Sequence, residues 1–240
     1  MSDSSTLARL VAVVPAAGIG RRMGGSVPKQ YLSLAGKTVI EHAIQPLCNH
    51  PDIEKIVVAV GADDGHWPDL AIAGHPKVHR VDGGEERCHS VLNALNWLSD
   101  ENYSDALVMV HDAARPCLTT DDLNCLIAAA RCEDDGVLLG VPVRDTIKKV
   151  IKGSTEGSKA IDKTIDRSLL WRAQTPQMFD LQRLTKVLHQ AIDQNLMVTD
   201  DASAMELAGF SPVMVEGSEQ NIKMTTPEDL ALAEYYLAKR

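Results

Sequence analysis

The stretch from Pro15 to Lys29, PAAGIGRRMGGSVPK, combines several glycines with three cationic side chains. Gly18 and Gly20 allow the backbone to turn sharply and to approach a ligand closely, and the N–H groups of such a turn bind anions. Arg22 and Lys29 add positive charge beside these glycines. Because transfer at phosphorus depends mainly on positioning and on charge neutralisation, the pattern predicts a loop that holds a triphosphate.

Two other phosphate-binding loops fit this stretch less well. A dinucleotide fingerprint needs a third glycine where Met23 stands, and an oxidoreductase of that kind needs a ribose-binding acid near the end of the second strand. The segment 59–61 offers no such acid, although Asp63 and Asp64 follow it. The P-loop pattern G-x-x-x-x-G-K-[ST] does not occur. A plain strand-to-helix turn with solvated arginines is the remaining alternative.

Two further segments carry polar residues directly after predicted strands. In Asp82–Ser90 (DGGEERCHS), the paired glycines can take a flat base against the backbone, and Ser90 can read its edge. An ordinary turn before a helix is the alternative. In the segment 110–116 (VHDAARP), Asp112 can approach a Mg²⁺ ion that bridges phosphate oxygens. His111 is interpreted as a packed histidine.

A second phosphorylated substrate would need cations of its own, and the candidates are far apart in the chain. Arg115 can pair with Asp112 or face the phosphates, while Arg167 and Lys223 lie much later. Taken singly, such residues are more often surface charges. Thr199 begins the run TDD, which is interpreted first as a helix cap.

Short apolar runs alternate with longer segments of helical spacing in the first part of the chain. This alternation predicts an α/β fold with a mostly parallel, Rossmann-like sheet and helices on both faces. Ligands of such sheets bind beyond the carboxyl ends of the strands, which is where the three segments above fall. The predicted strands are Leu10–Val14, Lys55–Val60, Val78–Val81, Ala106–Val110 and Val137–Val141, and the predicted helices are Val39–Leu47, Arg87–Leu98 and Asp121–Arg131.

The second part of the chain begins with a predicted long β-hairpin. Arg144–Ile151 and Ala160–Arg167 alternate polar and apolar residues around the turn-rich Lys152–Lys159. Because a lone hairpin is marginal in water, we expect this arm to pack on a partner subunit, with its own domain as the alternative. Residues 1–240 then form one nucleotidyltransferase domain, with 143–170 as an arm for dimerisation. Beyond the arm, the pattern predicts helices over Asp180–Gln194 and Asp200–Ala208, a strand over Pro212–Val215 and a last helix near Thr226.

Composition limits the class of protein. The 240 residues are 45% hydrophobic, which suits one globular domain with a substantial core. A net charge of -9 and an aromatic content of 4% argue against a nucleic-acid surface. The five cysteines show no metal-binding spacing, no apolar run is long enough to span a membrane, and the N-terminus lacks a signal-peptide core. We therefore expect a cytoplasmic protein with no membrane partner.

Six motifs in order resemble one family. They are P-A-A-G-x-G-x-R-M…P-K-Q-Y, D-G-G-x-x-R-x-x-S, H-D-A-A-R-P, P-V-x-D-T-x-K, T-P-Q-x-F and N-x-K-x-T-x-P-E-D-L, between Val11 and Leu237. Together they resemble the 2-C-methyl-D-erythritol 4-phosphate cytidylyltransferases of the non-mevalonate isoprenoid pathway. The resemblance implies transfer of CMP from CTP to methylerythritol phosphate, with Mg²⁺, giving CDP-methylerythritol and pyrophosphate. It also implies homodimers in which the arm of each subunit reaches over the other's active site.

The same resemblance implies roles for particular residues. Arg22 and Lys29 would stabilise the α-phosphorus during in-line attack, and Arg167 and Lys223 would position the attacking phosphate, without a covalent protein intermediate. CTP would contact Ala16, Ala17, Gly18, Gly20, Arg22, Lys29, Gly84, Glu85, Ser90 and Asp112. The sugar phosphate would contact Asp112, Arg115, Thr146, Arg167, Thr199 and Lys223, with Thr146 and Arg167 acting in the partner's site. Asp112 would lie by the metal, directly or indirectly.

One residue departs from the family pattern, and one segment falls outside it. Glu85 stands where an aspartate is expected, and the arm tip, 153–158, matches no pattern. Ribitol-5-phosphate cytidylyltransferases and other sugar nucleotidyltransferases also have the glycine loop, and pyrophosphate release from CTP with each sugar phosphate separates these alternatives.

Overall fold

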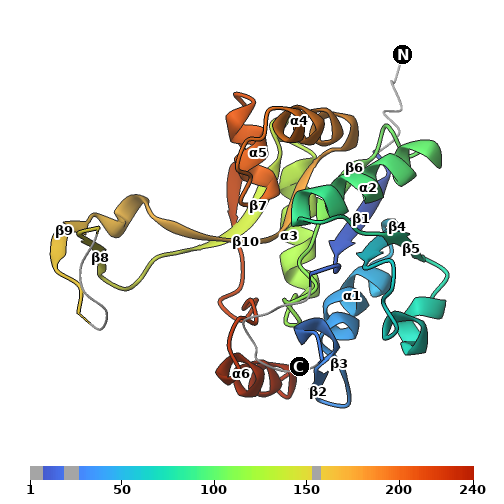
Figure 1. Cartoon of the computed structure of the whole chain (residues 1–240), viewed down its shortest axis with the longest axis horizontal. Helices are drawn as coiled ribbons and strands as arrows, with labels where there is room; N and C mark the ends of the chain where they lie inside the picture. Colours follow the sequence, from blue (N-terminus) through green and yellow to red (C-terminus); the bar gives the residue numbers. More distant parts are fainter. Residues whose placement is uncertain (1–7, 19–26, 153–157) are drawn as a thin grey trace.

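The computed structural model describes residues 8–18, 27–152 and 158–240. A seven-stranded sheet with the order β11-β7-β10-β6-β1-β4-β5 forms its centre (Figure 1). The strands are β1 (Leu10–Pro15), β4 (Ile53–Val60), β5 (Val78–Asp82), β6 (Leu107–Val110), β7 (Val137–Pro142), β10 (Trp171–Asp180) and β11 (Val213–Glu216). The helices are α1 (Val39–Asn49), α2 (Arg87–Asp100), α3 (Thr120–Ala130), α4 (Leu181–Asp193), α5 (Asp201–Leu207) and α6 (Glu228–Leu237).

Helices cover both faces of this sheet. Along β1, Leu10, Ala12 and Val14 belong to a core with α1 and α3, whereas Val11 and Val13 belong to a core with α2, α4 and α5. A strand buried on both faces is continuously apolar, which explains the uninterrupted hydrophobic run of β1. The predicted α/β fold with a mostly parallel sheet is confirmed, and the predicted strands and helices match to within a few residues at their ends. No helix among the described residues is long and apolar enough to cross a membrane.

Strand β10 runs antiparallel between β6 and β7 and was not predicted from the sequence. Three polar side chains of this strand, Gln174, Thr175 and Gln177, are buried. Polar residues beside Pro176 do not resemble a central strand, because proline lacks the N–H group for the ladder. The pairing is indeed irregular between Ala173 and Gln177.

The predicted hairpin is present as β8 (Ile147–Val150) and β9 (Ile161–Ile165), shorter than predicted. It extends away from the sheet (Figure 1), so the alternative of an arm packed on its own domain is wrong for the described residues. Val150 and Ile161, on this arm, are 44% and 59% exposed. The partner subunit expected to cover them stays a prediction.

Candidate active site

A cleft lies where the carboxyl ends of β1, β5 and β6 meet at one edge of the sheet. It brings together most of the residues predicted to bind CTP, although Gly20 and Arg22 lie outside the described residues. The lining residues are Pro15, Ala16, Ala17, Gly18, Lys29, Gln30, Gly84, Glu85, Glu86, Arg87, Ser90, Asp112, Ala113, Ala114 and Lys223.

A short 3-10 helix, Lys29–Tyr31, holds the start of the glycine loop in place. The buried Gln30 side chain donates hydrogen bonds from Nε2 to the carbonyl oxygens of Ala16 (2.8 Å) and Gly18 (3.1 Å). Lys29 Nζ donates to the carbonyl oxygen of Met224 at 3.3 Å, close to Lys223 in the chain. The lysine predicted to meet the triphosphate is therefore anchored to the C-terminal segment.

The loop after β5 packs directly against the loop after β1. A Cβ atom at Gly83 would lie 2.4 Å from Cβ of Ala17, so only glycine allows this approach. Ser90 is in the first turn of α2, as the alternative interpretation had it, and its Oγ accepts a hydrogen bond from Gly84 N at 3.0 Å. The hydroxyl also donates to Glu86 O at 3.2 Å, so Ser90 shapes this loop as well as lining the cleft.

Three cations converge on the Asp112 carboxylate. Lys223 Nζ donates to Oδ2 at 2.7 Å, Arg87 Nε donates to Oδ1 at 3.1 Å, and Arg115 Nε lies 3.8 Å from Oδ2. Burial opposes the charged form of Asp112, but Arg87 and Lys223 outweigh it and hold the pKa of this carboxyl below its ordinary value. Asp112 is therefore ionised at neutral pH. Arg87 was not predicted as a site residue from the sequence, because its partners, Asp112 and Asp201, lie far from it in the chain.

Arg115 and His111 are buried beside Asp112 and are held in place by hydrogen bonds to other parts of the chain. Arg115 donates to the carbonyl oxygens of Asn221 (2.7 Å) and Ala173 (3.3 Å), so backbone groups hold both terminal nitrogens of its guanidinium. His111 is fully buried, with Nε2 3.2 Å from Arg115 O and Nδ1 3.1 Å from Thr175 Oγ1. Because a carbonyl oxygen can only accept, Nε2 carries the proton. Burial lowers the pKa of His111 to about 4, consistent with the packed, neutral histidine that was predicted.

A second, smaller polar cavity adjoins the first and shares Arg87, Asp112 and Lys223 with it. Thr199, predicted to contact the sugar phosphate, lines this cavity. Asp200 is the N-cap of α5, as expected for the TDD run. The other lining residues are Arg115, Ala173, Gln174, Thr175, Gln177 and Asp200.

The arm residues do not reach either cavity of their own subunit. Thr146 is exposed, and Arg167 is exposed in a short 3-10 turn, where it donates to the carbonyl oxygen of Arg144. Neither residue lines the cavities described above. The action of both residues in the partner's site stays a prediction.

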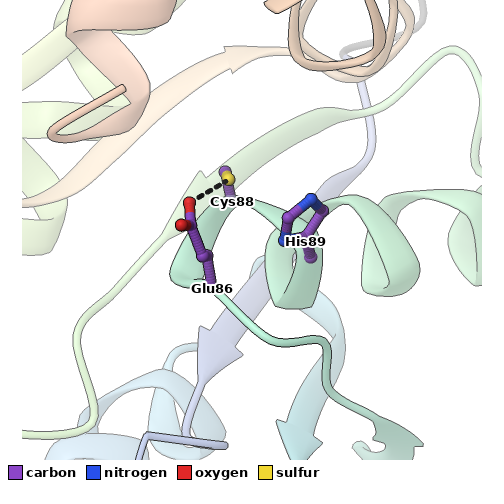
Figure 2. A group of neighbouring side chains, drawn as sticks. All are labelled: Glu86, Cys88 and His89. Carbon is purple, nitrogen blue, oxygen red and sulfur yellow. Dashed lines mark hydrogen bonds between the residues drawn. The ribbon is translucent and has the colours of Figure 1, made fainter. Parts of the chain in front are cut away.

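Side chains that could bind a metal ion near the cleft include a group with sulfur and nitrogen ligands and a separate carboxylate. Figure 2 shows Glu86, Cys88 and His89 at the start of α2, with their ligand atoms within 4.8 Å of one another. The Cys88 thiol donates to Glu86 Oε2 at 3.8 Å, and burial raises the pKa of this thiol. Sulfur and imidazole ligands suit zinc rather than Mg²⁺, which prefers oxygen. The Asp112 carboxylate, which also lines the cleft, offers oxygen ligands only.

A covered, mostly parallel sheet whose carboxyl edge carries a glycine-bearing loop, lysines and one buried carboxylate defines an α/β nucleotidyltransferase. Comparison with known proteins identifies the family of nucleotidyltransferases to which this chain belongs. The family model for 2-C-methyl-D-erythritol 4-phosphate cytidylyltransferase matches residues 10–239, and this chain belongs to that family.

Relatives match over nearly the whole chain. The cytidylyltransferase of Vibrio atlanticus is 49% identical over 236 residues, covering 98% of each chain. That of Escherichia coli O1:K1 / APEC is 47% identical over 228 residues, covering 95% of this chain and 93% of the relative. A crystal structure of the Francisella tularensis 2-C-methyl-D-erythritol 4-phosphate cytidylyltransferase has a TM-score of 0.81 at 37% identity, over 95% of this chain and 100% of that chain.

The neutral His111 predicts a specific pH dependence of stability. Its pKa is about 4 in the folded protein, against 6.5 ordinarily, so the unfolded chain takes up the proton first as pH falls. The free energy of unfolding should therefore decrease between pH 6.5 and pH 4, by about 3 kcal/mol from this group. Denaturant unfolding of the wild type and of His111→Gln, without added metal, measures the difference. Parallel pH profiles for the two proteins would refute the assignment.

The contact between the two loops predicts the effect of one added methyl group. Gly83→Ala would push the loop after β5 away from Ala17 and widen the cleft. We expect the affinity for CTP, measured by calorimetric titration, to fall about tenfold, as overpacking of this kind costs on the order of 1–3 kcal/mol. Gly65→Ala is the matched control, because its Cβ would meet nothing within 4 Å. Equal affinities in the two variants would contradict this role of Gly83.

Proposed function

We propose that this protein transfers CMP from CTP to 2-C-methyl-D-erythritol 4-phosphate, releasing pyrophosphate, in the synthesis of isoprenoid precursors. The observation that carries the proposal is the shared edge between the two cavities. Lys29 and Gly18 line one cavity, Thr199 lines the other, and Asp112 and Lys223 line both. A nucleotide and a second phosphate can meet there.

The reaction that we propose is an in-line displacement. An oxygen of the acceptor phosphate attacks the α-phosphorus of CTP, a new P–O bond forms, and the bond to pyrophosphate breaks. A phosphate monoester is mostly dianionic at neutral pH, so the attack needs no general base. The protein contributes alignment and positive charge, with Arg22 and Lys29 at the α-phosphorus and Lys223 beside the acceptor.

CTP binds in the proposed complex with its base in the loop after β5. Ala16, Ala17 and Gly18 contribute backbone groups from the other side of the cleft, opposite Gly84. Glu85, which replaces the aspartate expected in the family pattern, is exposed and lines the same cleft. Ser90 would act mainly by holding Gly84 N in place, since its hydroxyl already makes two hydrogen bonds to this loop.

Mg²⁺ is proposed as the cofactor, with Asp112 as the nearest protein ligand. Both Asp112 oxygens already accept hydrogen bonds, from Arg87 and Lys223, but a carboxylate retains further lone pairs. Asp112 would hold a Mg²⁺ ion together with oxygens of the triphosphate, since oxygen is the ligand that this metal prefers. When bound, the ion neutralises charge on the phosphate oxygens.

The active form is proposed to be a homodimer in the cytoplasm, without nucleic-acid or membrane partners. The arm presents exposed apolar residues, including Leu169 (85%) and Ile161 (59%), beyond the domain that carries the cleft. A neighbouring subunit would bury them. In such a dimer Thr146 and Arg167 would reach the acceptor in the partner's site.

An assay of pyrophosphate release tests the function itself. Wild-type protein should turn over CTP with methylerythritol phosphate, and much more slowly UTP or ATP. Turnover with ribitol 5-phosphate but not with methylerythritol phosphate would overturn the proposed acceptor.

Loss of the cations at the α-phosphorus should lower kcat. We expect Lys29→Ala and Arg22→Ala each to reduce kcat on the order of 100-fold, since each removes charge that acts in the transition state. Lys37→Ala is the control, because Lys37 bonds Gln45 on the surface and does not line the cleft. A variant with near-normal kcat in the same assay would show that its residue does not contact the transition state.

Subunit mixing tests whether Arg167 acts across the dimer. Arg167→Ala alone should raise KM for the sugar phosphate, because a cation at the acceptor phosphate is lost. Mixing it with Lys29→Ala should recover activity at low substrate, since heterodimers then contain one site with both residues. If the mixture is no more active than its components, Arg167 does not act in the partner's site.

A further inference from the structure

Arg87 joins two carboxylates that belong to different elements. Its Nε donates to Asp112 Oδ1 at 3.1 Å, and its Nη2 donates to Asp201 Oδ2 at 2.8 Å. The Asp201 side chain is 1% exposed. A buried carboxylate keeps its charge only when it is paired, and Arg87 is the cation that the structure places within reach of Asp201.

The position of Asp201 relative to the cleft is fixed by β10. Gln177 donates from Nε2 to Asp200 Oδ2 at 2.8 Å, and its Oε1 accepts from Ala202 N at 2.8 Å. Gln177 itself pairs with Val110, the last residue of β6, two residues before Asp112. Gln177 of β10 therefore links the start of α5 to β6, the strand that ends two residues before Asp112.

Stabilisation of α5 alone does not explain this arrangement. Asp200 already caps the helix, in a reciprocal capping box with Ser203. A carboxylate in the first turn would gain from the helix dipole in an exposed position as well. Burial of Asp201 against Arg87 adds a link from α5 to Asp112 that a cap does not require.

We propose that Asp201 is a positioning residue for the transfer reaction, acting through Arg87 on Asp112 and Lys223. By accepting the hydrogen bond from Arg87 Nη2, Asp201 keeps Arg87 from donating from both Nε and Nη2 to Asp112. Asp112 Oδ2 thereby stays available to Lys223 Nζ, which lies 2.7 Å away. Without Asp201, the two-pronged pairing that arginine prefers with a carboxylate would compete with Lys223.

Steady-state kinetics give the first test, which rests on the proposed function. Asp201→Asn keeps the size of the side chain and removes its charge. We expect KM for methylerythritol phosphate to rise about tenfold, with KM for CTP changed much less, because a charge-assisted bond is lost on the acceptor side. The control is Asp121→Asn, an exposed aspartate in the first turn of α3. If both variants retain the wild-type KM, the proposal is wrong.

Arg87→Lys provides a second variant, whose result does not depend on the folding of Asp201→Asn. A lysine keeps the charge but cannot pair with both oxygens of Asp112 through a planar fork, so Lys223 should keep its contact with Asp112 and KM for methylerythritol phosphate should rise no more than about twofold. A rise in KM of about tenfold would contradict the competition between Arg87 and Lys223. Adding Asp201→Asn to Arg87→Lys should then have little further effect. Independent, multiplying effects of the two substitutions would mean that Asp201 does not act through Arg87.

A crystal structure of the Asp201→Asn protein tests the positioning role independently of enzymatic activity. We expect Arg87 to pair with both oxygens of Asp112, and Lys223 Nζ to leave hydrogen-bond distance of Asp112. Retention of the Lys223–Asp112 contact would overturn the positioning role, whatever the acceptor proves to be. Absence of wild-type turnover, with the predicted shift of Lys223, would instead refute the proposed function alone.

Discussion

The charge cluster around Asp112 is the interaction on which the rest of the site depends. One nearly buried carboxylate, 10% exposed in its side chain, meets Arg87, Arg115 and Lys223, which come from α2, from the loop after β6 and from the C-terminal segment. None of these cations could be held so close to the others without the shared anion, because like charges repel at this distance. The cluster thus fixes three parts of the chain at the mouth of the cleft, and it leaves an excess of positive charge where phosphates would bind.

This cluster also explains the unusual composition of β10. A central strand normally carries apolar side chains on both faces, yet Thr175 and Gln177 are buried here. Thr175 Oγ1 accepts from Asp112 N at 3.0 Å and lies against His111, while Gln177 holds the start of α5. In place of apolar packing, the buried polar side chains of β10 bind the backbone of Asp112 and the start of the helix that carries Asp201.

Much of this arrangement could be predicted from the sequence, because strand-end motifs in a parallel sheet must meet at one edge. The glycine loop, Asp82–Ser90 and Asp112 were placed in this way, and the fold followed from the alternation of apolar runs and helical segments. The sequence could not reveal β10, whose buried polar residues serve partners far away in the chain. It also could not reveal Gln30, Gly83 or Arg87 as organisers of the site, because each acts through a contact with another segment. The arm was predicted as a hairpin, but the lengths of its strands depend on local pairing that alternation alone does not specify.

The most direct measurement of the central role of Asp112 is steady-state pyrophosphate release by Asp112→Asn with CTP and methylerythritol phosphate. Asparagine keeps the shape of the side chain but cannot neutralise Arg87 and Lys223. With folding verified by an unchanged circular dichroism spectrum, we predict that kcat falls on the order of 100-fold and that KM for the sugar phosphate rises. Turnover within a few-fold of the wild type, at unchanged KM, would contradict the view that this carboxylate organises the site.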